Sequence, residues 1–161
     1  MAWQNEIVRI VRHLISDIDT DDPTYDNSRL EETVLVAAQL VRNELEFATN
    51  YTIDVDAATF TPDPTYSPKD NDFITLISLK ASLLILASEY KTYSVTSMRI
   101  SDGPSSIDTT DMTRNAKFLY ENALADYIRA KNQYRAGNSI AGQAILSPYT
   151  YAGIMGIFNP N

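Results

Sequence analysis

The chain has 161 residues, of which 44% are hydrophobic and 21% charged, a composition that argues against disorder of the whole chain. It carries 13 Lys and Arg against 21 Asp and Glu, a formal net charge of -8, which argues against wrapping nucleic acid because phosphate binding requires a basic surface. The absence of cysteine excludes disulfides, thiolate zinc sites and a thiol nucleophile.

The beginning of the chain predicts an amphipathic helix that ends near Asp19. Its charges recur throughout residues 1–17, without the apolar stretch or cleavage site of a signal peptide, so we expect no export signal. His13 falls on the polar side of this helix and has no partner by motif, so we interpret it as a solvated residue and not a catalytic base. The predicted buried stripe is Trp3, Ile7, Ile10, Val11, Leu14 and Ile18.

An acidic cluster, Asp17 to Asp22, follows this helix. Its alternating aspartates are similar to the start of a calcium loop. However, Asp22 stands where such a loop needs glycine, and Ser28 stands where it needs a bidentate glutamate. We therefore interpret the cluster as a solvated helix end and loop, and we predict no metal site.

A second helix is predicted from Ser28, because Glu31 three residues later completes a capping-box pattern. Its main buried stripe is Leu30, Val34, Ala37, Val41, Leu45 and Ala48, widened by Val36, Leu40 and Phe47.

The third helix is predicted to start at Ser67-Pro68, with Ser67 as the cap and Asp70 in the first turn. From Phe73 to Tyr90 it is apolar nearly all round and should be the most enclosed helix. Its most apolar run is interrupted by Lys80 and two serines and is too short to span a bilayer, so we expect a core helix.

The fourth helix is predicted from Asp108 or Thr109 to a stop at Gly137. Its aligned residues are Met112, Ala116, Leu119, Ala123, Tyr127, Ala130 and Tyr134. Four helices of this length predict a mainly α fold, a four-helix bundle with short β or loop insertions and an extended C-terminal tail.

Two short strands are expected on either side of the third helix, one at Tyr51 to Val55 and one at Met98 to Ile100. They could pair with each other or across subunits. Turn-rich segments follow each of them, at Thr61 to Tyr66 and at Asp102 to Ser106.

Catalytic motifs are missing from the sequence. There is no glycine-rich phosphate loop, HExxH or GxSxG pattern, and the chain has one histidine. A carboxylate metal site built from Glu31, Glu44 and Glu89 would lack the characteristic Glu-x-x-His pairing. We therefore expect no enzyme, no catalytic residue, no metal and no cofactor.

The last segment, Asn138 to Asn161, is apolar and aromatic but interleaved with Gly and Pro, so it can bury side chains only while extended or turning. It either folds back on its own core or docks onto another subunit or protein, because exposed apolar surface of this size marks an interaction site.

The order of these parts resembles the head-tail adaptor (connector) proteins of tailed bacteriophages. The resemblance covers most of the chain: NYTIDVDAATFTPDPTYSP after the second helix, SPKDNDFITLISLKASLLILASEY, MRISDGPSSIDTTD, a long last helix and an extended tail. The region from Asp72 to Asp111 is its most specific portion.

The resemblance implies a helical adaptor domain over residues 1–137 and an extended C-terminal arm over 138–161. It implies a twelve-copy ring beneath the portal protein in the virion, made in the host bacterial cytoplasm, with no membrane contact. Such a ring continues the channel for DNA, which passes without specific binding, and joins the next neck or tail protein. An acidic chain suits a conduit that must not hold a polyanion.

Two sets of candidate site residues follow. Portal or neighbour-subunit binding is assigned to Leu146, Tyr149, Tyr151, Ile154, Ile157 and Phe158. The lumen or tail-side loops are assigned to Pro62, Asp63, Tyr66, Asp102 and Ser105. The alternatives are another phage neck or tail ring, a stopper or terminator, which would be richer in strand, or a small helical protein-binding regulator. A regulator that binds DNA would need a basic recognition helix, which no predicted helix supplies.

Overall fold

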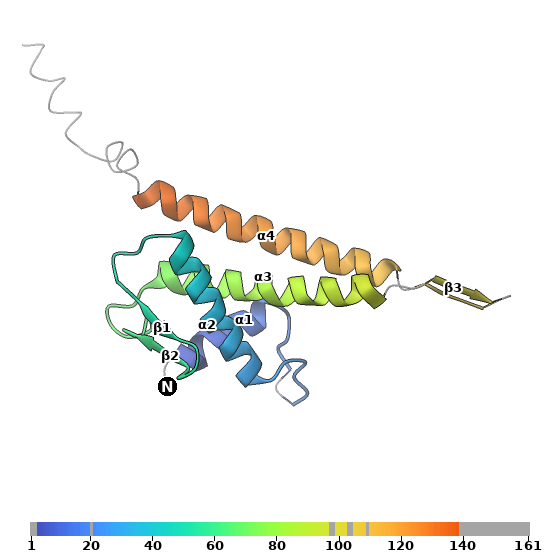
Figure 1. Cartoon of the computed structure of the whole chain (residues 1–161), viewed down its shortest axis with the longest axis horizontal. Helices are drawn as coiled ribbons and strands as arrows, with labels where there is room; N and C mark the ends of the chain where they lie inside the picture. Colours follow the sequence, from blue (N-terminus) through green and yellow to red (C-terminus); the bar gives the residue numbers. More distant parts are fainter. Residues whose placement is uncertain (1–2, 20, 97–98, 103–104, 109, 139–161) are drawn as a thin grey trace, which may run out of the picture.

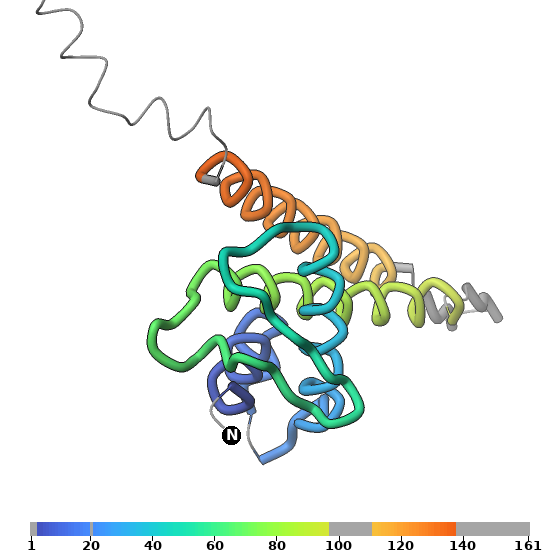
Figure 2. Tube along the Cα trace, turned by 60° about the vertical axis from the view of Figure 1, so that its left-hand side comes forward, coloured from blue at the N-terminus to red at the C-terminus, as the bar shows by residue number. Residues whose placement is uncertain are grey.

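The computed structural model describes residues 3–19, 21–96, 99–102, 105–108 and 110–138. This part of the chain is mainly helical, as the sequence predicted (Figure 1). The elements in chain order are a π-helical segment η1 (Gln4–Val8), α1 (Arg9–Leu14), α2 (Asn27–Glu44), β1 (Thr52–Asp54), β2 (Thr59–Thr61), α3 (Asn71–Thr96), β3 (Arg99–Asp102), β4 (Ser105–Asp108) and α4 (Thr110–Asn138). In both views α3 lies between α4 and α1 (Figures 1 and 2).

The first helical stretch, η1 with α1, ends at Leu14 and not near Asp19. Ser16 takes a positive φ of 61° directly after it and turns the chain away. The buried stripe predicted for this helix is therefore correct at its start and wrong at its end. Trp3, Ile7, Val8 and Val11 are buried, whereas Leu14 and Ile18 are exposed because they lie at or beyond the turn.

The second helix, α2, begins at Asn27, with Asp26 in the N-cap position and no side-chain cap hydrogen bond. The predicted capping box of Ser28 and Glu31 is thus wrong, because both residues already lie inside the helix. The main stripe is confirmed by the burial of Leu30, Val34, Ala37, Val41 and Leu45, but it is wrong for Ala48, which is exposed and lies beyond the end of the helix. Val36 and Leu40 do not widen it; each is 38% exposed on the outer side of the helix.

The core helix α3 starts later than predicted and continues farther, to Thr96. Asp70 caps it in place of Ser67, since its Oδ1 accepts a hydrogen bond from the N–H of Phe73 at 2.9 Å. Its other oxygen accepts the Tyr51 hydroxyl hydrogen bond at 2.8 Å. Ten residues between Phe73 and Leu86 are buried, which confirms the expectation of an enclosed helix, whereas Asn71, Asp72 and Thr75 are exposed.

By length and composition α3 is also apolar enough to cross a membrane. However, 56% of its apolar window is buried inside the protein, which is typical of a core helix in a folded domain.

The fourth helix, α4, runs along α3, and the two are the most extensively paired elements of the fold (Figure 1). Its bounds agree with the prediction to within two residues. Ala116 and Tyr127 are buried, and Tyr120, Ala123 and Tyr134 pack against the core, as the aligned stripe predicted. Met112 and Leu119 are exposed in spite of their place on that stripe.

Two antiparallel hairpins replace the two single strands that the sequence predicted. In the first, Thr52 of β1 pairs with Thr61 of β2. In the second, Arg99 of β3 pairs with Asp108 of β4, and Asp102 with Ser105. Each expected strand is thus paired with its own chain neighbour and not with the other expected strand. Asp102 and Ser105, predicted as loop residues, are strand residues.

Aromatic rings fill the core between the first hairpin and α3. Phe73 stacks on Tyr51, with 4.1 Å between ring centroids, and packs edge-on against Phe47 at 4.9 Å. Trp3 meets Phe60 edge-on at 4.8 Å. Burial of one such large side chain stabilises the fold by about 1.5–3 kcal/mol, so these rings hold the hairpin and the first helix onto α3.

Candidate functional site

The ends of α3 and α4 that are joined by the β3–β4 hairpin extend past the rest of the fold (Figure 1). We call this part the distal arm: residues 87–96 of α3, residues 110–122 of α4 and the hairpin. Along α3, which is described in full, the last buried side chain is Leu86, one residue before the arm begins. The Tyr25 hydroxyl donates a hydrogen bond to Glu89, and Tyr120 packs against the core, so the base of the arm is tied to the body of the fold.

Contacts within the arm hold its two helices together. The rings of Tyr90 on α3 and Tyr120 on α4 stack at 6.0 Å. Ala116 is buried between the helices, where its small side chain lets them approach. Nearer the tip, the Thr113 hydroxyl donates a hydrogen bond to the carbonyl oxygen of Tyr93 at 3.1 Å.

Large apolar side chains remain exposed on the distal arm. Phe118 is 62% exposed and Val95 is 85% exposed. The set comprises Tyr93, Val95, Met112, Phe118 and Leu119. Single exposed apolar residues are normal on a protein surface, but several on one projecting segment mark an interaction surface. The arm is thus the candidate functional site of the described chain.

A charged cluster around Glu44 fixes α4 to the rest of the fold. Glu44, the last residue of α2, accepts hydrogen bonds from Lys80 of α3 at 2.8 Å and from Lys131 of α4 at 2.6 Å. The Tyr127 hydroxyl donates to the same carboxylate at 2.9 Å. Lys80 also lies over the Tyr127 ring, 4.6 Å from its centroid. Three helices therefore meet at one carboxylate.

The pKa values of Glu44 and Tyr127, the two acidic groups of this cluster, are shifted in opposite directions. Burial alone would raise the pKa of Glu44, but the hydrogen bonds from Lys131, Lys80 and Tyr127 outweigh it and lower that pKa to about 2. Burial raises the pKa of the Tyr127 hydroxyl, and its hydrogen bond to the Glu44 carboxylate raises it further. Glu44 is therefore charged and Tyr127 neutral at physiological pH, which is the state that the cluster needs.

The C-terminal half of α4 also donates hydrogen bonds to backbone carbonyl groups at the end of α2. Arg135 donates a hydrogen bond to the carbonyl oxygen of Glu44 at 3.2 Å, and the Tyr134 hydroxyl donates one to the carbonyl oxygen of Glu46 at 3.0 Å. Helix ends leave such carbonyls without intrahelical partners. These contacts and the Glu44 cluster hold one half of α4 on the core, while the other half belongs to the distal arm.

The acidic cluster after α1 folds around an arginine. Asp17 is buried, forms an ion pair with Arg12 and accepts a hydrogen bond from the N–H of Thr24 at 2.9 Å. Arg12 also donates to the carbonyl oxygen of Tyr25 at 2.7 Å. The interpretation of the cluster as solvated is thus wrong for Asp17, whose role is to hold the loop between α1 and α2.

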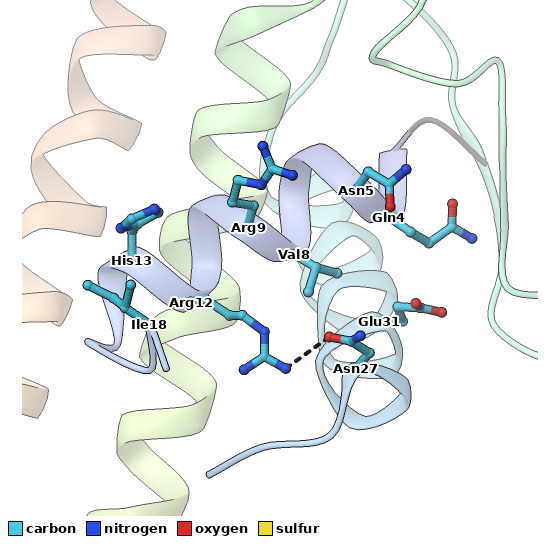
Figure 3. Close-up of a pocket in the computed structure, with 9 residues that line it drawn as sticks. All are labelled: Gln4, Asn5, Val8, Arg9, Arg12, His13, Ile18, Asn27 and Glu31. Atoms are coloured by element: carbon cyan, nitrogen blue, oxygen red, sulfur yellow. Dashed lines mark hydrogen bonds between the residues drawn. The ribbon is translucent and has the colours of Figure 1, made fainter. Parts of the chain in front are cut away.

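A groove of about 320 Å³ lies between α1 and α2. Figure 3 shows Arg12 within it, hydrogen-bonded to Asn27, with His13 at one end and Glu31 at the other. His13 is exposed, as predicted. Because His13 and Glu31 lie apart, they do not form an acid–base pair. Within the described ranges, no three His, Cys, Asp or Glu side chains are grouped to hold a metal ion.

The predicted site residues fall in three places. Pro62, Asp63 and Tyr66 lie in the loop between β2 and α3, with Tyr66 exposed, and Asp63 accepts hydrogen bonds from the N–H and hydroxyl of Thr65. Asp102 and Ser105 lie in the paired strands of the distal hairpin, far from that loop (Figure 1). The six tail residues, from Leu146 to Phe158, lie outside the described residues.

Neither the distal arm nor the Glu44 cluster was predicted from the sequence. The signal for the arm was present, since Ile100 and Ile107 lie symmetrically about Gly103-Pro104 and predict a hairpin that joins two long helices.

Comparison of the chain with family models, curated proteins and solved structures finds no match in any of the three.

Proposed function

We propose that the protein is a structural subunit of a bacteriophage virion, a head-tail connector that forms a twelve-copy ring beneath the portal protein. In this proposal its four helices act as one bundle-like adaptor domain over residues 1–137. The ring extends the DNA channel and joins the capsid to the next neck or tail protein. The sequence resemblance suggests this role, and the observation that carries it is the exposed apolar surface of the distal arm.

The distal arm supports assembly because it has the form of a contact element. The last buried side chain of α3 is Leu86, and α4 carries exposed Phe118 and Leu119 into solvent. Helices gain most of their stability from tertiary packing, so an arm with uncovered apolar side chains is stabilised when another protein covers it. A ring supplies that cover once for each copy, since each subunit presents one surface and receives another.

The charge of the chain supports the passage of DNA through the ring without binding. A net charge of -8 per subunit repels phosphate and keeps DNA from binding to the channel wall. We assign the β2–α3 loop, with Pro62, Asp63 and Tyr66, and the tip strands, with Asp102 and Ser105, to the lumen or the tail-side face of the ring.

The C-terminal arm, residues 138–161, is proposed to attach the ring to the portal or to a neighbouring subunit. At about 3.3 Å per residue it can span up to about 75 Å from the end of α4. We assign the contacts to Leu146, Tyr149, Tyr151, Ile154, Ile157 and Phe158, because a few large apolar side chains dominate most interfaces.

Sedimentation of the purified protein, alone and mixed with a candidate portal assembly, tests this function. Electron microscopy of any large species then gives the copy number. We expect a ring of about a dozen copies in at least one sample, since a portal can serve as the template for subunits that do not assemble alone. A protein that remains a monomer or dimer in both samples contradicts the connector function.

A further inference from the structure

Two outward helix faces of this chain carry apolar side chains flanked by charges. One lies on α4 in the distal arm, and the other lies on α2 in the body of the fold. We call them the α4 face, consisting of Asp111, Arg114, Phe118 and Asn122, and the α2 face, consisting of Arg29, Glu32, Val36 and Leu40.

The α2 face borders a groove. A hollow of about 340 Å³ lies between α2 and α3, lined by Val36 and Glu32 from α2 and by Leu84 and Ile85 from α3. Val36 and Leu40 lie one turn apart, and each is 38% exposed. The groove therefore offers apolar Val36, Leu84 and Ile85 among polar Arg29, Glu32, Thr33 and Ser88, with room for a large side chain.

The α4 face offers a side chain of that kind. Phe118 is 62% exposed and lies on the opposite side of α4 from buried Ala116 and Tyr127. Asp111 and Arg114, which precede it on the same face, form an exposed ion pair at 3.3 Å. Phe118 can thus enter a groove on another molecule while the charges lie at the edge of the contact.

The charges of the two faces are complementary when the helices lie parallel. Both faces have the same spacing, because their residues follow at steps of three, four and four along the chain. Placing Phe118 against Val36 sets Arg114 against Glu32. It also sets Asp111 against Arg29, so both flanking pairs have opposite signs.

The antiparallel alignment lacks this match. With Phe118 again against Val36, Arg114 would face Leu40 and Asp111 would face Asn43. Neither pairing joins opposite charges, so charge complementarity selects the parallel arrangement.

We propose that Phe118 of one copy docks into the α2–α3 groove of the next copy, with the α4 face parallel to the α2 face. This inference rests on the proposed function, because it supplies the contact between neighbouring subunits of the ring. In the ring the α4 face of each copy meets the α2 face of the next copy, so the contact is heterologous and every copy both gives and receives it. In this contact Phe118 is the anchor, since large buried aromatic side chains dominate interfaces and exposed ion pairs add little.

Engineered cysteines test the contact directly, because the natural chain has none. The pair Asn122→Cys with Leu40→Cys lies one turn beyond Phe118 and Val36 in the same register and keeps the anchor, so mild oxidation of assembled rings should join copies into a ladder of disulfide-linked oligomers. A disulfide requires Cα atoms within about 7 Å, so the ladder reports direct apposition. The matched control pairs Asn122→Cys with Arg42→Cys, on another side of the same helix, and should give no ladder.

The single variant Asn122→Cys serves as a second control. Covalent dimers formed by this variant alone would show that two copies of the α4 face meet each other, which contradicts the proposal. Rings in which Asn122→Cys with Leu40→Cys forms no ladder would contradict it as well.

Charge reversal tests the register. Arg114→Glu and Glu32→Arg should each raise the concentration needed for half-assembly by about fivefold, and the combined variant should return it toward the natural value. The control is Arg129→Glu, which removes a similar ion pair with Asp126, at 3.4 Å, on a turn of α4 that would lie beyond the end of α2 in this register. Equal effects of Arg129→Glu and Arg114→Glu would contradict the register.

The outcomes separate this inference from the proposed function. Natural protein that forms rings while the Asn122→Cys and Leu40→Cys pair stays unlinked in assembled rings overturns the contact and leaves the connector function standing. Natural protein that forms no ring with or without a portal overturns both.

Discussion

Glu44 and Lys131 are 87 residues apart in the chain, and the Lys131 Nζ lies 2.6 Å from the Glu44 carboxylate. This ion pair joins the end of α2 to the middle of α4. Lys80 and Tyr127 bind the same carboxylate, so the contact between three helices depends on the Glu44 side chain.

We first expect Glu44→Gln to destabilise the fold by about 2 kcal/mol, because it removes the charge that two lysines share in a partly buried site. Urea unfolding followed by circular dichroism measures the loss. Glu121→Gln is the control, since it removes a carboxylate paired with Lys117 on the exposed side of α4 and should cost less than about 0.5 kcal/mol. Equal losses in the two variants would contradict the role of Glu44.

Glu44 should also make the stability of the fold depend on pH. The folded-state pKa of Glu44 is lowered from 4.5 to about 2, so its contribution is complete above pH 4.5 and is lost as the pH falls toward 2. The difference in unfolding free energy between the natural protein and Glu44→Gln should therefore shrink across this window. Urea titrations at pH 7, 5, 4 and 3 measure this difference. A difference in unfolding free energy that stays constant across these pH values would contradict the lowered pKa of Glu44.

Asp17→Ala should release the loop between α1 and α2. The substitution leaves Arg12 without its ion pair and the N–H of Thr24 without its acceptor, at a cost of about 3 kcal/mol. Hydrogen exchange at the amides of Thr24 and Tyr25 should become faster. Asp22→Ala, at an exposed position of the same acidic cluster, should leave both rates unchanged.

Phe73→Leu should cost about 2 kcal/mol, because it removes the ring that stacks on Tyr51 and leaves a partly filled cavity. Thermal unfolding measures the loss. Leu119→Ala, on the exposed side of the distal arm, is the control and should leave the stability of the monomer within about 0.5 kcal/mol.

Deleting Ala144 to Asn161 should leave the helical domain folded and abolish attachment to the portal, if the C-terminal arm has the proposed role. Circular dichroism checks the first outcome and co-sedimentation with a portal assembly checks the second. The full-length variant Leu146→Ser, Ile154→Ser and Phe158→Ser separates the loss of side chains from the loss of length. Unchanged affinity of the truncated protein would contradict the role of the arm.

The sequence predicted the helices well, because their buried stripes depend on local periodicity. Leu30 and Val34 of α2 and Phe73 of α3 are buried as expected. Helix starts were less predictable. Asp70 replaces Ser67 as the cap of α3, because its carboxylate also binds the hydroxyl of Tyr51, a contact that depends on the folded hairpin.

Contacts between distant parts of the chain could not be predicted from periodicity. Asp17 was expected in solvent, and only the path of the loop brings it back to Arg12. Val36 and Leu40 are apolar and were placed in the core, but the described part of this chain leaves them open to solvent. The candidate site depends on such exposed residues, which a pattern of apolar positions does not distinguish from buried ones.

The continuous path of α3 has a mechanical consequence. This helix has 26 residues and a length of about 39 Å, and it reaches from the aromatic core at Phe73 to the base of the distal hairpin. A force on the hairpin is therefore passed along one continuous helix to the buried part of α3, from Phe73 to Leu86. Lys80 lies within this buried part, so its ion pair with Glu44 ties the loaded helix to the end of α2.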